Sequence, residues 1–174
     1  ETPGVDAATG PLGIGLSAAL GLSMALKLDN SPARVYAILG DGEINEGTVW
    51  EALMGAVKFK ADNLCAILDW HGVQLDGTTE EVMPMGDIPA KFKAFGWNVM
   101  QVDGHDVDAL RATFEQAKQN RGTGKPTVII AETTKGKGVS FMENNAGWHG
   151  KATNPAEFEI AMTELKAALA EMEA

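Results

Sequence analysis

Four runs of apolar residues predict the strands of a parallel sheet. They cover Arg34–Leu39, Leu64–Asp69, Trp97–Val102 and Thr127–Glu132. Most of these runs are continuous rather than alternating, which is typical of strands covered on both faces. Helical patterns separate them, at Pro11–Lys27, Glu46–Phe59, Ile88–Phe95 and Val107–Asn120. This order predicts an α/β protein in which residues 1–174 form one domain around a three-layer, doubly wound parallel sheet.

The last helix has the clearest start signal in the chain. Asn154 can cap it, Pro155 suits the first helical position, and Glu157 completes a capping box. One apolar stripe follows at helical spacing, formed by Phe158, Met162, Leu165, Leu169 and Met172. We expect this stripe to pack on the sheet or on a partner.

Composition and charge narrow the class of ligand. The chain has 174 residues, of which 45% are hydrophobic and 20 are glycine, enough for one core of ordinary size. Its formal net charge is −10. A general nucleic-acid surface is excluded, because such surfaces neutralise phosphates with many Lys and Arg side chains. An anionic ligand must therefore be held locally, by a metal ion and by backbone groups.

An uncharged stretch raises the question of a membrane segment. Residues Ala7–Leu26 carry no charge, and a span of about 20 apolar residues can cross a bilayer. The stretch includes Pro11, two serines and four glycines, and it lacks the basic flanks that orient a membrane helix. We expect a buried helix, no membrane association and no signal peptide. Cys65 is the only cysteine, so no internal disulfide can form and a reducing cytoplasm is the expected setting.

Asp41 is the most informative residue for chemistry. It lies between Gly40 and Gly42, after a predicted strand and before a predicted helix, and so at the carboxyl end of the strand, where open α/β sheets bind ligands. A glycine loop there offers backbone N–H groups to phosphate, but the carboxylate would repel that anion. A divalent cation between them resolves the conflict. Asp41 would be one ligand, and the segment Asp69–Val73 at the end of the next strand would supply the others.

Several segments of this sequence resemble transketolase. Gly40-Asp41-Gly42, followed after about thirty residues by a turn, is similar to the thiamine diphosphate motif. Four other segments agree with the same family, TPGVDAATGPLG (2–13), VQLDGTTEEVM (73–83), VDGHD (102–106) and KGKGVSFMEN (135–144). The similarity covers nearly the whole chain and is greatest to transketolases made of two polypeptides. It implies the diphosphate-binding fold, in an amino-terminal subunit that lacks the family's upstream segment.

The resemblance assigns contacts around the cofactor. Gly10 and Leu12 would lie against its ring system, with a simple tight turn as the alternative for the glycine. Asp41 would bind the metal and Gly42 would approach the diphosphate; the alternative for Asp41 is a helix cap. Glu46 matches a glutamate of the network between the two halves of the active site, or else a first-turn acid favoured by the helix dipole.

His71 departs from the family pattern. Relatives have asparagine there, and its side-chain oxygen and the carbonyl two residues later, here that of Val73, both bind magnesium. Magnesium prefers oxygen ligands, whereas imidazole suits zinc, nickel, copper or iron. Three outcomes follow. The site keeps magnesium weakly, it takes another divalent ion, or it is degenerate and His71 is a surface turn residue.

The resemblance also suggests three further contacts with the cofactor or substrate, each of which has an alternative. Leu75 matches an aliphatic residue of the cofactor pocket, although a core position is the alternative. Lys135, with Lys137, resembles a loop near the diphosphate, or else is an exposed lysine pair. His149 resembles a histidine on the substrate side and is the candidate catalytic residue; a surface turn is the alternative. His105 is expected only to hold a loop.

The implied reaction is two-carbon ketol transfer between sugar phosphates, in carbohydrate metabolism such as the pentose phosphate pathway, with thiamine diphosphate and magnesium or another divalent ion as cofactors. The family's activating glutamate lies on a separate pyrimidine-binding domain. We therefore expect a homo- or hetero-oligomer in which the partner is the carboxyl-terminal transketolase subunit, and no activity of this chain alone.

Two other functions fit the sequence. A dinucleotide-binding protein also has a glycine turn after a strand, but Gly47 comes too late for its fingerprint. A noncatalytic binding or assembly module that kept the fold but lost the cofactor site is the second alternative, and His71 is the reason to consider it.

Overall fold

A computed structural model describes residues 2–173. The strands are β1 (Val35–Gly40), β2 (Leu64–Trp70), β3 (Asn98–Asp103) and β4 (Thr127–Glu132). The α-helices are α1 (Ile14–Leu28), α2 (Gly47–Lys58), α3 (Thr79–Val82), α4 (Ile88–Ala94), α5 (Val107–Lys118) and α6 (Pro155–Met172). Two short 3-10 helices, η1 (Glu43–Asn45) and η2 (Ala146–Trp148), complete the order. All four predicted strands are present, each within one residue of its predicted bounds.

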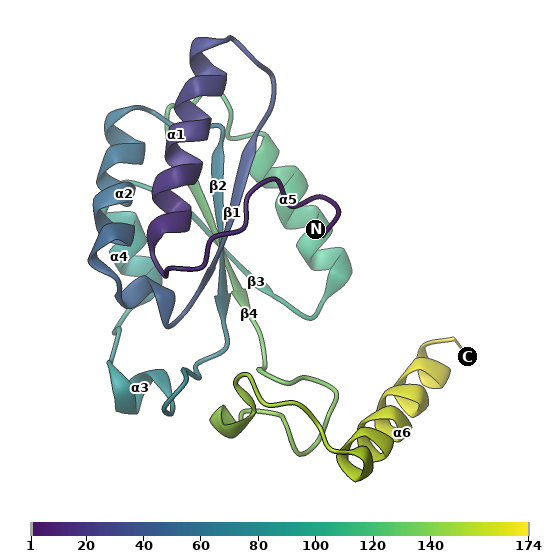
Figure 1. The fold of residues 1–174 in the computed structure, drawn as a ribbon. Coiled ribbons are helices and arrows are strands. Elements are labelled where there is room, and N and C mark those ends of the chain that lie inside the picture. The colour runs from purple at the N-terminus through teal and green to yellow at the C-terminus, as the bar shows by residue number, and fades with distance from the viewer. Residues whose placement is uncertain (1, 174) are drawn as a thin grey trace.

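The sheet is parallel, with the strand order β1-β2-β4-β3. Helices α1, α2 and α4 cover one face, and α5 covers the other (Figure 1). The chain moves across the sheet in one direction from β1 to β3 and then turns back to β4. Because crossovers between parallel strands are right-handed, that reversal places α5 on the opposite face. The three-layer, doubly wound architecture predicted from the sequence is confirmed.

Successive residues of a central strand pack into two separate hydrophobic cores, one on each face of the sheet. Leu64, Ala66 and Leu68 of β2 join a large cluster with α1, α2 and α4, in which Phe92 is fully buried. Cys65 and Ile129 join a small cluster under α5 instead. Both faces of the central strands are therefore apolar, which explains the continuous rather than alternating pattern. Burial also raises the pKa of the Cys65 thiol to about 12, although nearby Arg34 lowers it slightly, so the thiol is unreactive as expected.

Polar contacts close the amino-terminal edge of the sheet. Asp62, in the loop before β2, accepts hydrogen bonds from the backbone N–H groups of Gly122 (2.8 Å) and Gly124 (3.0 Å). Its other oxygen accepts from the Lys27 ammonium at 2.7 Å. Both carboxylate oxygens of Asp62 are therefore engaged within the protein, which indicates a structural role.

Helix α1 begins later than the sequence pattern predicts. We expected it from Pro11, but Gly13 adopts a left-handed conformation with φ of 83° and serves as the cap before Ile14. The preceding segment is exposed and non-helical. In residues 2–173 no helix has both the length and the apolar character needed to cross a bilayer.

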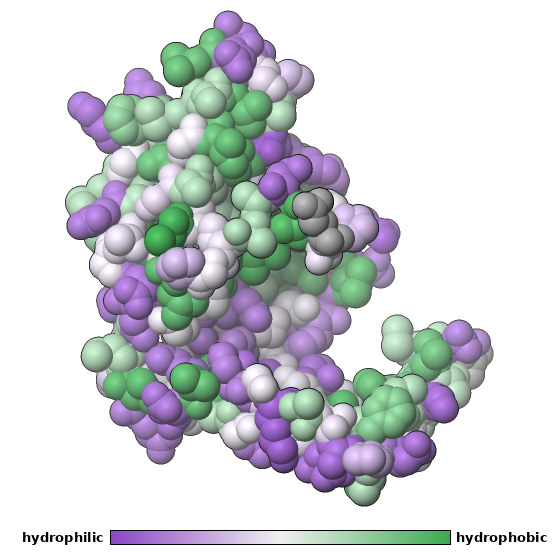
Figure 2. Space-filling view, in the orientation of Figure 1, coloured by the Kyte–Doolittle hydropathy of each residue, from purple (hydrophilic) through white to green (hydrophobic). Residues whose placement is uncertain are grey.

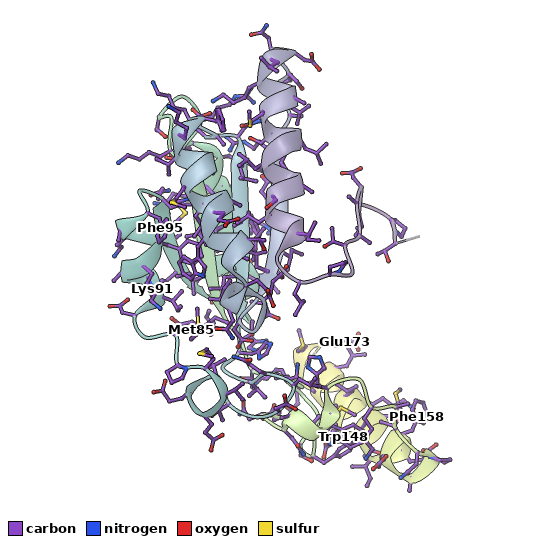
Figure 3. All side chains as sticks on the ribbon, turned by 60° about the vertical axis from the view of Figure 1, so that its left-hand side comes forward. Met85, Lys91, Phe95, Trp148, Phe158 and Glu173 are labelled. Carbon is purple, nitrogen blue, oxygen red and sulfur yellow. The ribbon has the colours of Figure 1, made fainter. Side chains whose placement is uncertain are left out.

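The carboxyl-terminal part of the chain lies apart from the body. Helix α6 begins at Pro155 with the predicted capping box between Asn154 and Glu157. Its apolar stripe does not pack on the sheet, which corrects one of the two placements expected for it: Leu169 is 54% exposed and Met172 is 85% exposed. Figure 2 shows apolar surface on this projecting helix. Trp148 and Phe158 lie in the outlying part, away from Met85, Lys91 and Phe95 of the body (Figure 3).

Candidate functional site

Three segments meet at the carboxyl-terminal edge of the sheet. They are the turn before α1 (residues 9–13), the loop after β1 (40–46) and the turn after β2 (71–78). The Gly13 N–H donates to Glu43 Oε1 at 2.9 Å and joins the first segment to the second. The Gly72 N–H donates to Asp41 Oδ2 at 2.7 Å and joins the third segment to the second. The site therefore combines the residues that the sequence placed at two strand ends and one helix start.

Asp41 lies at the centre of this arrangement. Gly40 is the last residue of β1, so the aspartate follows the strand directly, as predicted, and it is only 2% exposed. Oδ1 accepts from the N–H of Gly42 (2.8 Å), and Oδ2 accepts from that of Gly72. No Lys or Arg of the described chain pairs with it. A buried carboxylate with two backbone donors and no Lys or Arg partner is a strong candidate to hold a cation.

His71 contacts Asp41 directly. Its Nδ1 lies 3.3 Å from Asp41 Oδ2 and also 3.2 Å from the Val73 backbone nitrogen. A ring nitrogen has one in-plane position for a proton, an acceptor contact or a metal. A protonated Nδ1 donates to Asp41, and an unprotonated Nδ1 accepts from Val73. In either state Nδ1 is engaged by one of these two groups, so this nitrogen can bind a metal only after the ring moves away from them.

The turn after β2 contains a backbone oxygen without a hydrogen bond from the described residues. Gly72 is left-handed, with φ of 73°, and an isolated bridge between Val73 and Thr78 closes the turn. Val73 is buried, and its carbonyl oxygen accepts no hydrogen bond from any described residue. Leu75 at the tip is 61% exposed, so the core position considered for it is wrong.

Two polar side chains beside Gly42 were not singled out from the sequence. The Nε2 atom of Gln74 and the Oδ1 atom of Asn45 are buried and have no hydrogen-bond partner in residues 2–173. The Gln74 side chain covers Gly42, since a Cβ built there would lie 3.5 Å from Gln74 Cγ. Only one feature of the sequence indicated that Gln74 is buried: it lies between two apolar residues of the turn. An unpaired buried amide beside a glycine loop is a ready donor for an anionic ligand.

The turn before α1 packs closely on the start of α2. A Cβ at Gly13 would lie 2.4 Å from Thr48 Oγ1 and 2.8 Å from Glu46 Cβ, so only glycine fits. Leu12 is 61% exposed and Gly10 is also exposed. Glu46 is the N-cap residue of α2, without a side-chain capping bond, rather than a first-turn acid. Its carboxylate therefore stays available at the open edge.

Lys135 and His149 lie in the segment between β4 and α6. Figure 1 shows this segment at the same end of the sheet as α3. No hydrogen bond or ion pair within residues 2–173 joins either side chain to the Asp41 loop, so the expected roles remain predictions. His105 holds a loop as expected, because its Nε2 accepts from the Thr134 N–H at 2.7 Å.

Metal-ligating side chains do not cluster elsewhere. Among the described residues no group of three or more His, Cys, Asp or Glu side chains is placed to hold a metal ion. Asp69 is engaged with the Thr133 hydroxyl. Any ion in this edge would therefore depend on Asp41 together with backbone oxygen and water.

Comparisons with known proteins identify the family of this chain. Residues 1–170 match the family model described as the transketolase, thiamine diphosphate-binding domain. The 6-deoxy-6-sulfo-D-fructose transketolase subunit of Clostridium sp. (strain MSTE9) is 42% identical over 95% of this chain and 60% of its own length. An apulose-4-phosphate transketolase subunit of Phocaeicola vulgatus is 39% identical over 99% of this chain and 61% of its own length.

A solved structure gives the same result for the fold. Transketolase from Campylobacter jejuni superposes with a TM-score of 0.84 at 32% identity, covering 92% of this chain and 26% of that one. The chain thus spans about three fifths of the length of the subunit relatives, 60% and 61%, and a smaller share of this structure.

Proposed function

This chain belongs to the transketolase family, as its thiamine diphosphate-binding domain, and we propose that it is part of a transketolase that transfers a two-carbon ketol unit between sugar phosphates. The family favours thiamine diphosphate over a dinucleotide as the ligand. Two relatives are named as subunits, which supports a second polypeptide, the carboxyl-terminal subunit with the pyrimidine-binding domain, as partner.

The observation that carries the proposal is the buried Asp41 carboxylate, which has two backbone donors and, within the described residues, neither a Lys nor an Arg partner. A divalent ion supplies the missing positive charge, and the free Val73 carbonyl is the second oxygen ligand. The unpaired Gln74 amide beside Gly42 is the available donor for the diphosphate, because the Gly42 N–H already donates to Asp41. This donor suits a metal-bound diphosphate.

His71 sets the choice of ion. Because its ring nitrogen contacts Asp41 and Val73, magnesium must displace it without gaining an oxygen ligand in return. Zinc can gain the imidazole if the ring rotates. We expect binding to be weaker with magnesium than with zinc.

The remaining residues of the edge prepare the reaction. When bound, thiamine diphosphate supplies the acidic thiazolium carbon and the electron sink that no side chain provides. Leu12 and Leu75, each 61% exposed, would exclude water from the ring side once a partner covers them. Glu46 would meet the partner at the open edge, and Lys135 and His149 would approach the phosphate and the substrate. The exposure of the two leucines is a second reason, after the activating glutamate on the separate pyrimidine-binding domain, to expect no activity of the chain alone.

The test is calorimetric titration of the purified chain with thiamine diphosphate in the presence of Mg²⁺, Mn²⁺ or Zn²⁺. We expect binding that depends on the ion and is weaker with Mg²⁺ than with Zn²⁺. His71→Asn should tighten the Mg²⁺-supported Kd by about tenfold, because it restores an oxygen ligand. Absence of binding with all three ions, for both the wild type and His71→Asn, would contradict the proposal. Ketol transfer by the chain without any partner would contradict its partner requirement.

One observation favours a second function. The His71–Asp41 contact fills the space beside the carboxylate with the protein's own side chain. A noncatalytic binding or assembly module would show this arrangement with no cofactor affinity. If His71→Asn binds thiamine diphosphate and the wild type does not with any ion, the module is the correct function and the histidine is the cause.

A further inference from the structure

Glu43 links two segments of the site through both of its carboxylate oxygens. Oε1 accepts from the Gly13 N–H at 2.9 Å, and Oε2 accepts from the Gly40 N–H at 3.3 Å. Gly13 belongs to the turn before α1, whereas Gly40 ends β1, so the two donors are far apart in sequence. Glu43 itself begins the short helix η1, directly after the glycine loop.

Each of these donors adjoins a residue expected to touch the cofactor. Gly13 follows Leu12, on the ring side, and Gly40 precedes Asp41, on the diphosphate side. The turn before α1 is otherwise held by close packing, because Gly13 lies against Thr48 and Glu46 without room for a Cβ. Its residues 9–12 are all exposed, so few other contacts fix the turn against the loop.

We propose that Glu43 is a positioning residue that sets the separation between the ring-binding turn and the diphosphate-binding loop. This inference rests on the proposed function. Thiamine diphosphate carries its ring and its diphosphate in one molecule, so it benefits from two subsites held at the right distance. A ligand that occupies only the diphosphate subsite gains nothing from that distance.

If Glu43 acted only through its charge, its substitution would have the opposite effect on ligand affinity from the one that positioning predicts. A carboxylate close to a phosphate-binding loop repels the anion, so removal of its charge should by itself tighten anion binding. Positioning predicts that the same removal weakens thiamine diphosphate. The sign of the change therefore separates the two contributions of Glu43.

The experiment compares two ligands on the intact chain. The Kd of thiamine diphosphate and the Kd of inorganic pyrophosphate are measured by calorimetry, each with the divalent ion that best supports the wild type. Glu43→Gln keeps the side-chain shape but has a single acceptor oxygen and places an amide donor against a backbone N–H. We expect it to weaken thiamine diphosphate by about tenfold, the loss typical of one charge-assisted hydrogen bond, and Glu43→Ala to weaken it further.

Pyrophosphate affinity should remain within about twofold or increase in both variants. Amide hydrogen exchange, measured without any ligand, should be faster at Gly13 in Glu43→Gln. The matched control is Glu81→Gln, since Glu81 also accepts a backbone N–H, that of Thr78, in the capping box of α3. Neither ligand should respond to this control.

Three results would overturn the inference. Equal weakening of both ligands would indicate general damage to the site, and tighter binding of both would indicate charge alone. Unchanged exchange at Gly13 would show that Glu43 does not hold the turn. A wild-type chain that binds pyrophosphate with metal but not thiamine diphosphate would instead refute the proposed function; the exchange rate at Gly13 would then still show whether Glu43 holds the turn.

Discussion

Two buried aspartates lie at opposite ends of the sheet. Each accepts hydrogen bonds from two backbone N–H groups, but only one of them also pairs with an ammonium group. Asp62, at the amino-terminal edge, is 8% exposed and accepts two backbone N–H groups from the loop before β4. Asp41, at the carboxyl-terminal edge, is 2% exposed and also accepts two. The Lys27 ammonium completes the first set at 2.7 Å, whereas only an imidazole lies near the second, at 3.3 Å.

We infer that this difference separates a structural carboxylate, Asp62, from a metal-binding one, Asp41. Backbone donors reduce the cost of burying the charge at both ends, but only the protein's own ammonium neutralises it. At the carboxyl-terminal ends of the strands, no Lys or Arg of the described residues pairs with Asp41, so a bound cation can provide the positive charge. The following substitutions test whether Asp41 contributes mainly to ligand binding and Asp62 mainly to the free energy of unfolding.

The largest effect should come from Asp41→Asn. The variant keeps the size of the side chain and loses the anionic metal ligand, so metal-dependent binding of thiamine diphosphate should weaken by at least about 100-fold. Calorimetry measures the loss. Asp62→Asn is the matched control and should bind as the wild type does. Equal loss in both variants would show that the two carboxylates are not functionally different.

The next effect is the loss of stability in Asp62→Ala. The change leaves the Lys27 ammonium and the Gly122 and Gly124 N–H groups without their acceptor, and should lower the free energy of unfolding by about 2–3 kcal/mol. Urea denaturation measures it. Thiamine diphosphate affinity of the folded variant should not change. A loss below about 0.5 kcal/mol, the range of neutral surface substitutions, would contradict the structural role.

Substitution of two glycines, one before α1 and one inside it, compares a segment of the site with an ordinary helix. Gly13→Ala forces an alanine into a left-handed conformation against Thr48 and should lower the free energy of unfolding by about 1–2 kcal/mol. Gly21→Ala, inside α1 with open space around its Cβ, should raise it by about 0.5–1 kcal/mol. Thermal or urea unfolding of both variants decides; effects of the same sign would contradict the geometry at Gly13.

The smallest effect is a pH dependence that arises at Asp62. Burial alone would raise the pKa of this carboxyl, but the hydrogen bonds from Lys27, Gly124 and Gly122 outweigh it and hold the pKa below 3.8. The unfolded state then binds the proton more tightly. The stabilising contribution is present above pH 3.8 and is lost as the pH falls through the lower folded value.

Asp62→Asn should remove that part of the dependence. Urea unfolding of the wild type and the variant between about pH 5 and pH 2 compares the slopes, and the variant should show the shallower one. Identical slopes would mean that Asp62 does not titrate differently in the folded and unfolded states.

Local sequence patterns were sufficient for the elements. Continuous apolar runs identified every strand, because strands buried on both faces need no alternation. The capping residues of α6 fixed its first residue, because they satisfy backbone groups within one turn. The pattern missed α3, which is only one turn long, and placed the start of α1 too early, because the left-handed conformation of Gly13 depends on its packing against Thr48.

The sequence by itself determined the fold, the family and the place of Asp41 at the end of a strand, since each depends on residues that are neighbours in the chain. Only the tertiary structure decided which groups complete the site. The His71–Asp41 contact, the free amide of Gln74 and the link through Glu43 join segments that are distant in sequence. Such contacts depend on where the sheet brings its strand ends together, and no spacing along the chain encodes that distance.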